Sequence, residues 1–268
     1  MAFAVHRPES VPAVIAALAG PGRVAVSGGT LVIRDINEGR SFPNAIVSLR
    51  RAGLSGVVRN AETIDIGAAT PIADLARPEL AFLDAVLRGF ASPTLRNMAS
   101  LGGNLFAPRP YGDSGVALLA LDASLGIAGP HGARHMPLLE FYVAGIAADE
   151  IVTGLRFALP APGTWRWLKA TRRALNSASV VAIAAVVETD SAGTVAAARI
   201  ALGGVDAHPV RSPAAEAALR GRVLDAAAAS HAGEEAAAAH PCFADAYASA
   251  WYRRRVLPVH MRRALLGI

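Results

Sequence analysis

The stretch Ser92–Asp122, which reads SPTLRNMASLGGNLFAPRPYGDSGVALLALD, decides how the rest of the chain is interpreted. At its centre, SLGGNL places the adjacent pair Gly102 and Gly103 between Ser100 and Asn104. Glycine pairs adopt positive φ easily and leave the backbone uncovered. Successive N–H groups in such a turn can converge on an anion, as they do around a phosphate. The stretch therefore predicts an anion-binding bend.

A second bend of the same kind lies upstream. The apolar run Val24-Ala25-Val26 leads directly into Ser27-Gly28-Gly29-Thr30. Two glycine pairs in one chain, each flanked by polar side chains, predict a ligand with two phosphates, which means a dinucleotide. Neither bend matches G-x-G-x-x-G or G-x-x-x-x-G-K-[ST], so the Rossmann and P-loop motifs are excluded. Each glycine pair taken alone is explained as readily by an ordinary turn.

Together, the segments SGGTLVI and LRNMASLGGNLFAPRPYGDSGVALLALDASL resemble the FAD-binding subunit of the molybdenum hydroxylases. This family includes the medium chain of carbon monoxide dehydrogenase-type enzymes and the flavin domain of xanthine dehydrogenase, and the similarity continues over nearly the whole chain. The resemblance implies an α+β fold. It implies a two-lobed FAD-binding domain of the PCMH/molybdopterin-dehydrogenase flavoprotein type over residues 1–160, divided near residue 55, and a small α/β C-terminal domain over residues 161–268.

The resemblance further implies that the FAD pyrophosphate lies over both bends. Leu31 stands where the family often has Asp, which leaves only backbone contacts at that position. Ser100 keeps the hydroxyl of the commoner Thr, and the Asn104 amide suits ribityl hydroxyls or the flavin edge. Asp113 can accept from ribityl or ribose hydroxyls, or cap a helix over residues 114–121. The cofactor-binding residues expected around these segments are Val26, Ser27, Gly28, Gly29, Thr30, Leu31, Ser100, Gly102, Gly103, Asn104 and Asp113.

Three more residues are implied only by their places in the family pattern. Phe90 falls where relatives have an aromatic residue near the adenine, although a buried helix face explains it equally well. Ile151 falls where relatives pack an apolar side chain against the isoalloxazine ring, or it is simple strand core. Lys169 matches the Lys of the family segment F-x-K-x-x-x-R-x-x-x-D by the reactive face of the flavin, and Asn176 replaces its Asp. Arg109 is a further departure from the family pattern, and two roles stay open for it: contact with a phosphate, or obstruction of access to the flavin.

Composition excludes several other classes of site. The lone Cys242 rules out a disulfide framework and a cysteine-based iron–sulphur or metal site, and no metal ligands are predicted. The net charge of +5 comes almost entirely from Arg, and no basic run interleaved with aromatic residues appears, so nucleic-acid binding is not expected. No apolar run reaches the roughly 18 residues of a membrane span. We therefore expect no transmembrane segment and a cytoplasmic location.

Periodicity and turn residues indicate the order of the elements. Strands are expected at residues 3–5, 24–26, 45–49, 56–58, 64–66, 180–188 and 195–202. Helices are expected at residues 11–19, 71–76, 79–90, 114–121, 213–220 and 223–239, and from about residue 243 onward.

The function implied by the resemblance is electron transfer within a molybdenum-containing hydroxylase or dehydrogenase. The FAD would take electrons from the iron–sulphur clusters of a small partner subunit and pass them to an external acceptor. A large partner subunit would carry the molybdenum cofactor, in a heterotrimer or a dimer of heterotrimers. No nucleophile or acid–base pair at motif spacing is found, so no catalytic residue is predicted, which agrees with this role.

Two alternatives stay open at this point. One is a free-standing FAD-dependent oxidoreductase. The other is a scaffold subunit without flavin, which the departures at Leu31, Arg109 and Asn176 suggest. The substrate would bind a different chain, and the sequence does not distinguish NAD, oxygen, a quinone or another final acceptor.

Overall fold

The computed structural model describes residues 3–173 and 177–268, and packing divides the chain into two compact units. The first unit comprises Met1–Ala81, Ser92–Ala107 and Ser124–Phe157. The second comprises Phe82–Ala91, Pro108–Ala123 and Ala158–Ile268. Each unit is thus assembled from three separate segments of the chain.

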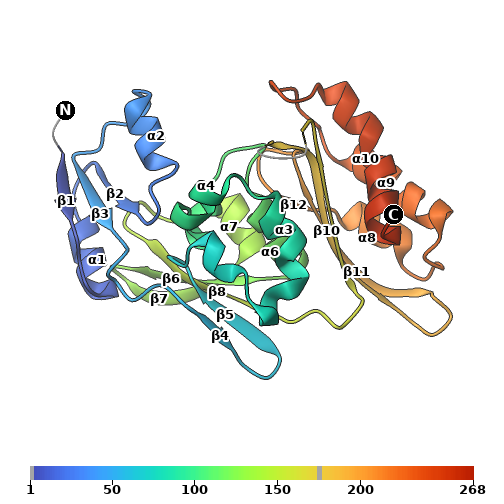
Figure 1. Cartoon of the computed structure of the whole chain (residues 1–268), viewed down its shortest axis with the longest axis horizontal. Helices are drawn as coiled ribbons and strands as arrows, with labels where there is room; N and C mark the ends of the chain where they lie inside the picture. The colour runs from blue at the N-terminus through green and yellow to red at the C-terminus, as the bar shows by residue number, and fades with distance from the viewer. Residues whose placement is uncertain (1–2, 174–176) are drawn as a thin grey trace. The chain divides into compact units, whose positions relative to one another are not determined.

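The first unit begins with a small parallel sheet of order β1-β3-β2 (Figure 1). Its strands are β1 (Ala4–His6), β2 (Arg23–Val26) and β3 (Ala45–Ser48). Helix α1 (Val11–Leu18) connects β1 to β2 and begins at Ser10, whose hydroxyl accepts from the N–H of Ala13. Helix α2 (Val32–Asn37) follows β2. The first glycine bend therefore lies at the carboxyl end of a strand, where α/β folds bind ligands.

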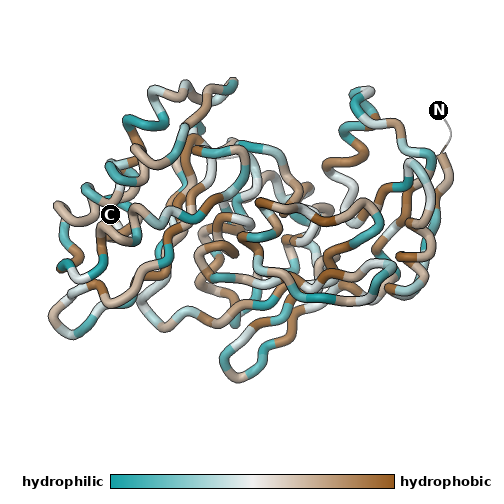
Figure 2. Tube along the Cα trace, turned by 180° about the vertical axis from the view of Figure 1, so that it is seen from behind, coloured by the Kyte–Doolittle hydropathy of each residue, from teal (hydrophilic) through white to brown (hydrophobic). Residues whose placement is uncertain are grey.

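A five-stranded sheet of order β4-β5-β8-β6-β7 forms the larger part of the first unit. Alternate residues of β5 are buried, which is the pattern of a strand with one covered face. Figure 2 shows that the tip of the β4–β5 hairpin is hydrophilic, as expected of a solvated turn. The strands are β4 (Val57–Arg59), β5 (Thr63–Gly67), β6 (Ser124–Gly129), β7 (Gly132–Pro137) and β8 (Ile151–Ala158). The helices of this unit also include η1 (Ile72–Leu75), α4 (Pro93–Met98), α5 (Leu101–Asn104) and α7 (Leu138–Ala144).

The second unit is an antiparallel sheet of order β12-β11-β10-β9. Every residue of β10 from Ser179 to Val187 is buried, because helices cover both faces of the sheet (Figure 1). Val181, Ile183 and other residues of one face join the core formed with the three C-terminal helices, while α6 packs against β10 and β11. The strands are β9 (Trp165–Thr171), β10 (Ser179–Thr189), β11 (Val195–Gly203) and β12 (Val210–Arg211), and the helices are α3 (Asp84–Gly89), α6 (Asp113–Ala120), α8 (Pro213–Leu219), α9 (Ala226–Ala239) and α10 (Ala250–Leu266).

Two predicted helices differ from the structure. The segment expected as one helix over residues 79–90 is a 3-10 turn, η2 (Pro78–Leu83), followed by α3. The last helix begins at Ala250, not near residue 243, because Ser249 caps it by accepting from the N–H of Tyr252. The chain before it is irregular and is held by the buried Arg253, which donates to the carbonyl of Phe243.

Within the described ranges, 3–173 and 177–268, no helix combines the length and the hydropathy that crossing a bilayer requires.

Candidate functional site

The first glycine bend leaves a row of backbone donors unused. Gly29 has φ +76°, in the left-handed region, whereas Gly28 does not. None of the N–H groups of Gly28, Gly29 and Thr30 donates to an acceptor in the described part of the chain, and the first bond after them runs from the N–H of Ile33 to the carbonyl of Gly29. Three successive half-buried N–H groups after a strand are the donors that a phosphate or pyrophosphate needs. The bend thus fits the pyrophosphate of FAD.

Gly28 also allows a close approach between two parts of the first unit. A Cβ atom there would collide with the carbonyl oxygen of Met98 and lie 3.0 Å from the Cα of Ala99. Because Ala99 directly precedes Ser100, the first bend packs against the residues that lead into the second. The two glycine segments, far apart in the sequence, are therefore neighbours within one unit.

The second glycine segment is not an open bend but the short helix α5. Ser100 is its N-cap, and the Ser100 hydroxyl accepts from the N–H of Gly103 at 3.2 Å. Neither Gly102 nor Gly103 has a positive φ. The N–H of Gly102 donates to the carbonyl of Ala68 at 2.8 Å, and the N–H of Leu101 is paired in the same way. The prediction of a bare, left-handed bend is wrong here, because carbonyls that follow β5 take up these donors.

The glycines of α5 instead permit close packing. A Cβ at Gly102 would lie 2.7 Å from the Cβ of Ala68, and a Cβ at Gly103 would lie 2.9 Å from the Ser100 oxygen. Gly103 and Asn104 are half-buried, while Ser100 is buried. Any contact of this segment with a ligand therefore uses the bare Gly103 surface and the Asn104 amide, not a ring of free N–H groups.

Three other expected cofactor-binding residues lie in less open surroundings. Val26 is the last residue of β2 and is buried. Leu31 is half-buried and precedes α2, where its side chain makes no capping bond. Ile151, the first residue of β8, is 3 % exposed and belongs to the core cluster that contains Val14 and Val47. Burial in that core supports the strand-core interpretation of Ile151, and its contact with a flavin ring stays a prediction.

In the second unit, Asp113 and Lys169 form a buried ion pair. The Lys169 Nζ donates to Asp113 Oδ2 at 2.6 Å and to the carbonyl of Gly89 at 2.8 Å, and each of the two charged side chains is only 9 % exposed. The Ser179 hydroxyl donates to Asp113 Oδ1 at 2.8 Å. Asp113 is not the N-cap of α6, as one interpretation predicted, because Gly112 takes that place with φ +98° and Asp113 is the first helical residue.

This cluster gathers the three expected cofactor residues of the second unit. Gly89, which accepts from Lys169, directly precedes Phe90, and Phe90 is 8 % exposed. Each Asp113 oxygen keeps a second lone pair, so the carboxylate can still accept from a ligand hydroxyl. Ser179 was missed by the sequence reasoning, since a lone serine at the start of an apolar strand carries no motif signal.

Arg109 makes a contact that the sequence did not indicate, and the two roles that the sequence left open for it stay predictions. Its guanidinium lies 4.0 Å from the centre of the Phe243 ring, and the guanidinium of Arg253 lies 4.4 Å from the same ring. This is a cation–π arrangement within the second unit. A further departure from the family pattern, Asn176, lies outside the described residues.

Neither the sequence nor the described residues supply a metal site. Among them, no group of three or more His, Cys, Asp and Glu side chains has the arrangement that would hold a metal ion.

Comparison with known proteins covers both units. Residues 1–161 match the family described as the FAD binding domain in molybdopterin dehydrogenase, and residues 166–268 match the CO dehydrogenase flavoprotein C-terminal domain. The carbon monoxide dehydrogenase medium chain of Afipia carboxidovorans is 29 % identical, over 98 % of this chain and 95 % of that protein. A putative xanthine dehydrogenase FAD-binding subunit of Escherichia coli is 29 % identical, over 79 % of this chain and 77 % of that protein.

Solved structures agree with this similarity. A carbon monoxide dehydrogenase from Hydrogenophaga pseudoflava that lacks the Mo-pyranopterin moiety superposes with a TM-score of 0.94 at 27 % identity, covering 99 % of this chain and 96 % of the matched chain. Quinoline 2-oxidoreductase from Pseudomonas putida 86 superposes with a TM-score of 0.92 at 26 % identity, covering 100 % and 96 %.

Proposed function

Since the chain belongs to the family of FAD-binding domains of molybdopterin dehydrogenases, we propose that it carries electrons between partner subunits and an external acceptor. The chain is an FAD-binding oxidoreductase subunit of the molybdenum hydroxylase type. In the proposed role, a large partner subunit carries the molybdenum cofactor and a small one carries iron–sulphur clusters. Electrons reach this chain from those clusters. FAD, when bound, supplies the ability to take up electrons singly and release them in pairs.

The first bend is the observation that carries the proposal. The N–H groups of Gly28, Gly29 and Thr30 have no acceptor in the described chain, so a pyrophosphate would satisfy them without breaking an existing bond. Ser27 and Thr30 add hydroxyl groups on either side. We expect this bend to hold the diphosphate and the bare surface at Gly103 to let it approach closely.

The residues of the second unit have a positioning role in the proposal. Lys169 and Ser179 fix the orientation of the Asp113 carboxylate, whose free lone pairs would accept from ribityl or ribose hydroxyls. Phe90 is expected near the adenine. The division into an FAD-binding domain over residues 1–160 and a C-terminal domain over residues 161–268 belongs to the same proposal, as does a cytoplasmic location.

Flavin retention tests this assignment directly. The purified chain should be yellow and carry FAD in equal amount, and the Gly103→Val variant should lose it, because the added methyl groups would occupy the surface that approaches the diphosphate. Ala61→Val, in the exposed tip of the β4–β5 hairpin, adds the same bulk elsewhere in the same unit and should leave FAD bound. Absorbance of the flavin after gel filtration gives the stoichiometry.

The two alternatives make different predictions for these measurements. A chain that never binds FAD under any reconstitution condition would support the scaffold alternative. A Gly103→Val variant with normal flavin content would remove α5 from the site. Isolation of the native protein, with analysis for molybdenum and iron, separates a subunit of a complex from a free-standing flavoenzyme.

A further inference from the structure

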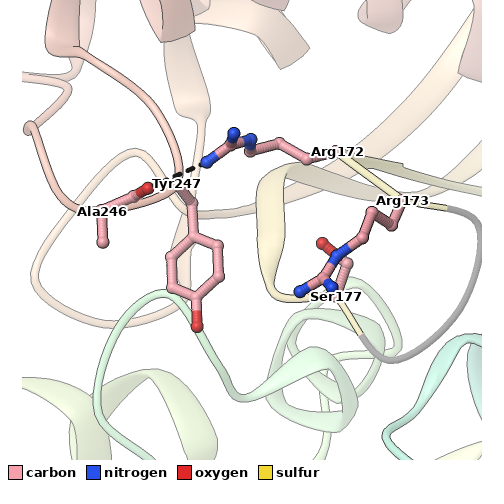
Figure 3. A pocket seen from close by; sticks show the side chains of 5 residues that line it. All are labelled: Arg172, Arg173, Ser177, Ala246 and Tyr247. Atoms are coloured by element: carbon pink, nitrogen blue, oxygen red, sulfur yellow. Dashed lines mark hydrogen bonds between the residues drawn. The ribbon is translucent and has the colours of Figure 1, made fainter.

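Several arginines of the second unit form no ion pair within the described chain, although Arg211 and Arg253 each do, at 2.8 and 2.9 Å. Arg172 and Arg173, which line a cavity of about 320 Å³ (Figure 3), follow the segment that the family pattern places by the flavin. They are therefore counted with the proposed flavin site. Others lie on the C-terminal helix α10, to which the proposed function assigns no role (Figure 1).

Helix α10 carries arginine and aromatic side chains on one exposed face. Its sequence, AWYRRRVLPVHMRRALL, contains no Asp or Glu. Exposed side chains recur in it at spacings of four and seven residues, which places them along one side of a helix. They are Trp251, Tyr252, Arg255, Val259, Arg262 and Arg263. We call this set the α10 face.

The opposite side of α10 is already used inside the unit. Leu257, Met261 and Leu265 are at most 1 % exposed and belong to the core that the C-terminal helices form with the sheet. The start of the helix is fixed as well, by the cap at Ser249 and by the buried side chain of Arg253. The α10 face is therefore presented on a rigid, packed element.

The three arginines of the α10 face have no neutralising partner within the described chain. By contrast, Arg254 of the same helix donates to the carbonyl of Pro241 at 2.8 Å. Glu234 of the adjacent helix α9 lies 3.9 Å from His231 and forms no ion pair with these arginines. A surface with several unpaired cations and no anion is complementary to a surface that carries carboxylates.

We propose that the α10 face docks an acidic segment of another protein. Guanidinium groups bind carboxylates through paired N–H donors, and clusters of arginine are a recurrent means of recognising acidic motifs. Trp251 is 70 % exposed, and Trp, Tyr and Arg are the residue types that contribute most to binding at protein interfaces. Val259 adds an apolar contact between the charges. The 17-residue helix is about 25 Å long, which a helical segment of similar length would cover.

Two other occupants fit the α10 face less well. A second copy of this chain would bring arginines against arginines, and like charges facing each other are destabilising. A helix that binds a bilayer surface buries its apolar side in the lipid, whereas the apolar side of α10 is in the core of the unit.

Fluorescence anisotropy of labelled helical peptides of about 16 residues tests the proposal on the purified chain. One peptide carries glutamates around a central leucine, and its control has glutamine in place of every glutamate. The acidic peptide should bind with an affinity that falls as salt rises, and the control should bind about tenfold more weakly or less. Equal affinity for both peptides, or no binding of the acidic one, would overturn the proposal.

Two further probes separate the other anionic partners. Tighter binding of a single-stranded DNA of equal charge would assign the α10 face to nucleic acid and overturn a protein partner. Tighter binding of vesicles of phosphatidylcholine and phosphatidylserine would do the same in favour of a membrane. Flavin content does not enter these measurements, because the α10 face shares no residue with the proposed flavin site.

The double variant Arg255→Gln with Arg262→Gln locates the binding on the α10 face. Both side chains are exposed, so folding should be unchanged, and we expect the affinity for the acidic peptide to fall about threefold to tenfold. Arg50→Gln with Arg59→Gln removes the same charge from exposed positions of the first unit and should change the affinity little. Equal loss in the two double variants would show a general charge effect and overturn the site.

Discussion

The bend after β2 and the polar cluster at the start of α6 differ in whether their hydrogen-bonding groups have partners within the described chain. At the bend, the N–H groups of Gly28, Gly29 and Thr30 have no acceptor among the described residues. In the cluster, both oxygens of Asp113 accept, from Lys169 and from Ser179. Buried polar groups are normally paired, so donors left open at a half-buried surface are the ones available to a ligand. The comparison separates backbone donors that are open to a ligand from side chains that are already paired with one another within one unit.

The helix α5 belongs with the cluster in this respect, although its sequence looks like the bend. Its N–H groups are taken by Ser100 and by the carbonyls of Ala68 and Thr70. A glycine pair thus leaves its backbone N–H groups without an acceptor in the bend after β2, whereas a second glycine pair forms a hydrogen-bonded helical turn in α5. The neighbouring carbonyls make the difference, and only the folded chain brings them there.

Among the changes considered, removal of the Lys169 cation from its cluster with Asp113 and Ser179 should have the largest effect on stability. Lys169→Met would leave Asp113 buried and charged without its partner, and we expect the free energy of unfolding to fall by about 3–5 kcal/mol. Denaturant titration measures the loss. The double variant Lys169→Met with Asp113→Asn should recover part of it, because the unpaired charge is gone. A loss below about 1 kcal/mol in the single variant would mean that the ion pair is effectively solvated. It would contradict the description of this cluster as a buried, paired site.

A methyl group at the open bend should have a smaller effect on stability and a larger one on the cofactor. Gly28→Ala forces the bend away from Met98, and we expect a loss of about 1–3 kcal/mol together with reduced FAD content. Ala61→Val, in the exposed tip of the β4–β5 hairpin, is the matched control, since it adds bulk at an exposed position of the same unit. Thermal unfolding and flavin absorbance check both variants. Normal FAD content in a destabilised Gly28→Ala protein would show that the open donors are not used.

The variants with the smallest expected effect on stability test whether Ser100 only caps α5 or also contacts the cofactor. Ser100→Ala and Ser249→Ala each remove an N-cap hydroxyl, and each should cost about 1 kcal/mol of stability. If the Ser100 hydroxyl also contacts FAD, only the first variant lowers the affinity for the cofactor, as measured by fluorescence titration. Equal FAD affinity in the two variants would show that the Ser100 hydroxyl has a purely structural role.

Local sequence predicted much of the fold and part of the candidate site. The family, the order of the elements and the strand–bend–helix around Gly28 follow from short-range patterns, because turn residues and apolar periodicity act over a few positions. Capping, one of the two roles expected for Asp113, was wrong, because Gly112 is the N-cap of α6. The pairing of Asp113 with Lys169 and Ser179 could not be predicted, because these residues come from strands far along the chain. Arg109 was equally unpredictable, because its partner Phe243 lies in an irregular segment with no motif.

By itself, the sequence determined the family, the cofactor class and the places where glycine interrupts regular structure, since these depend on residue type at fixed spacing. The tertiary structure decided which of those glycines leave their donors open, and it paired Asp113 inside the second unit. These outcomes depend on which carbonyls and charges arrive from distant segments, and hydrogen bonds and ion pairs form over a few ångströms whatever the separation along the chain.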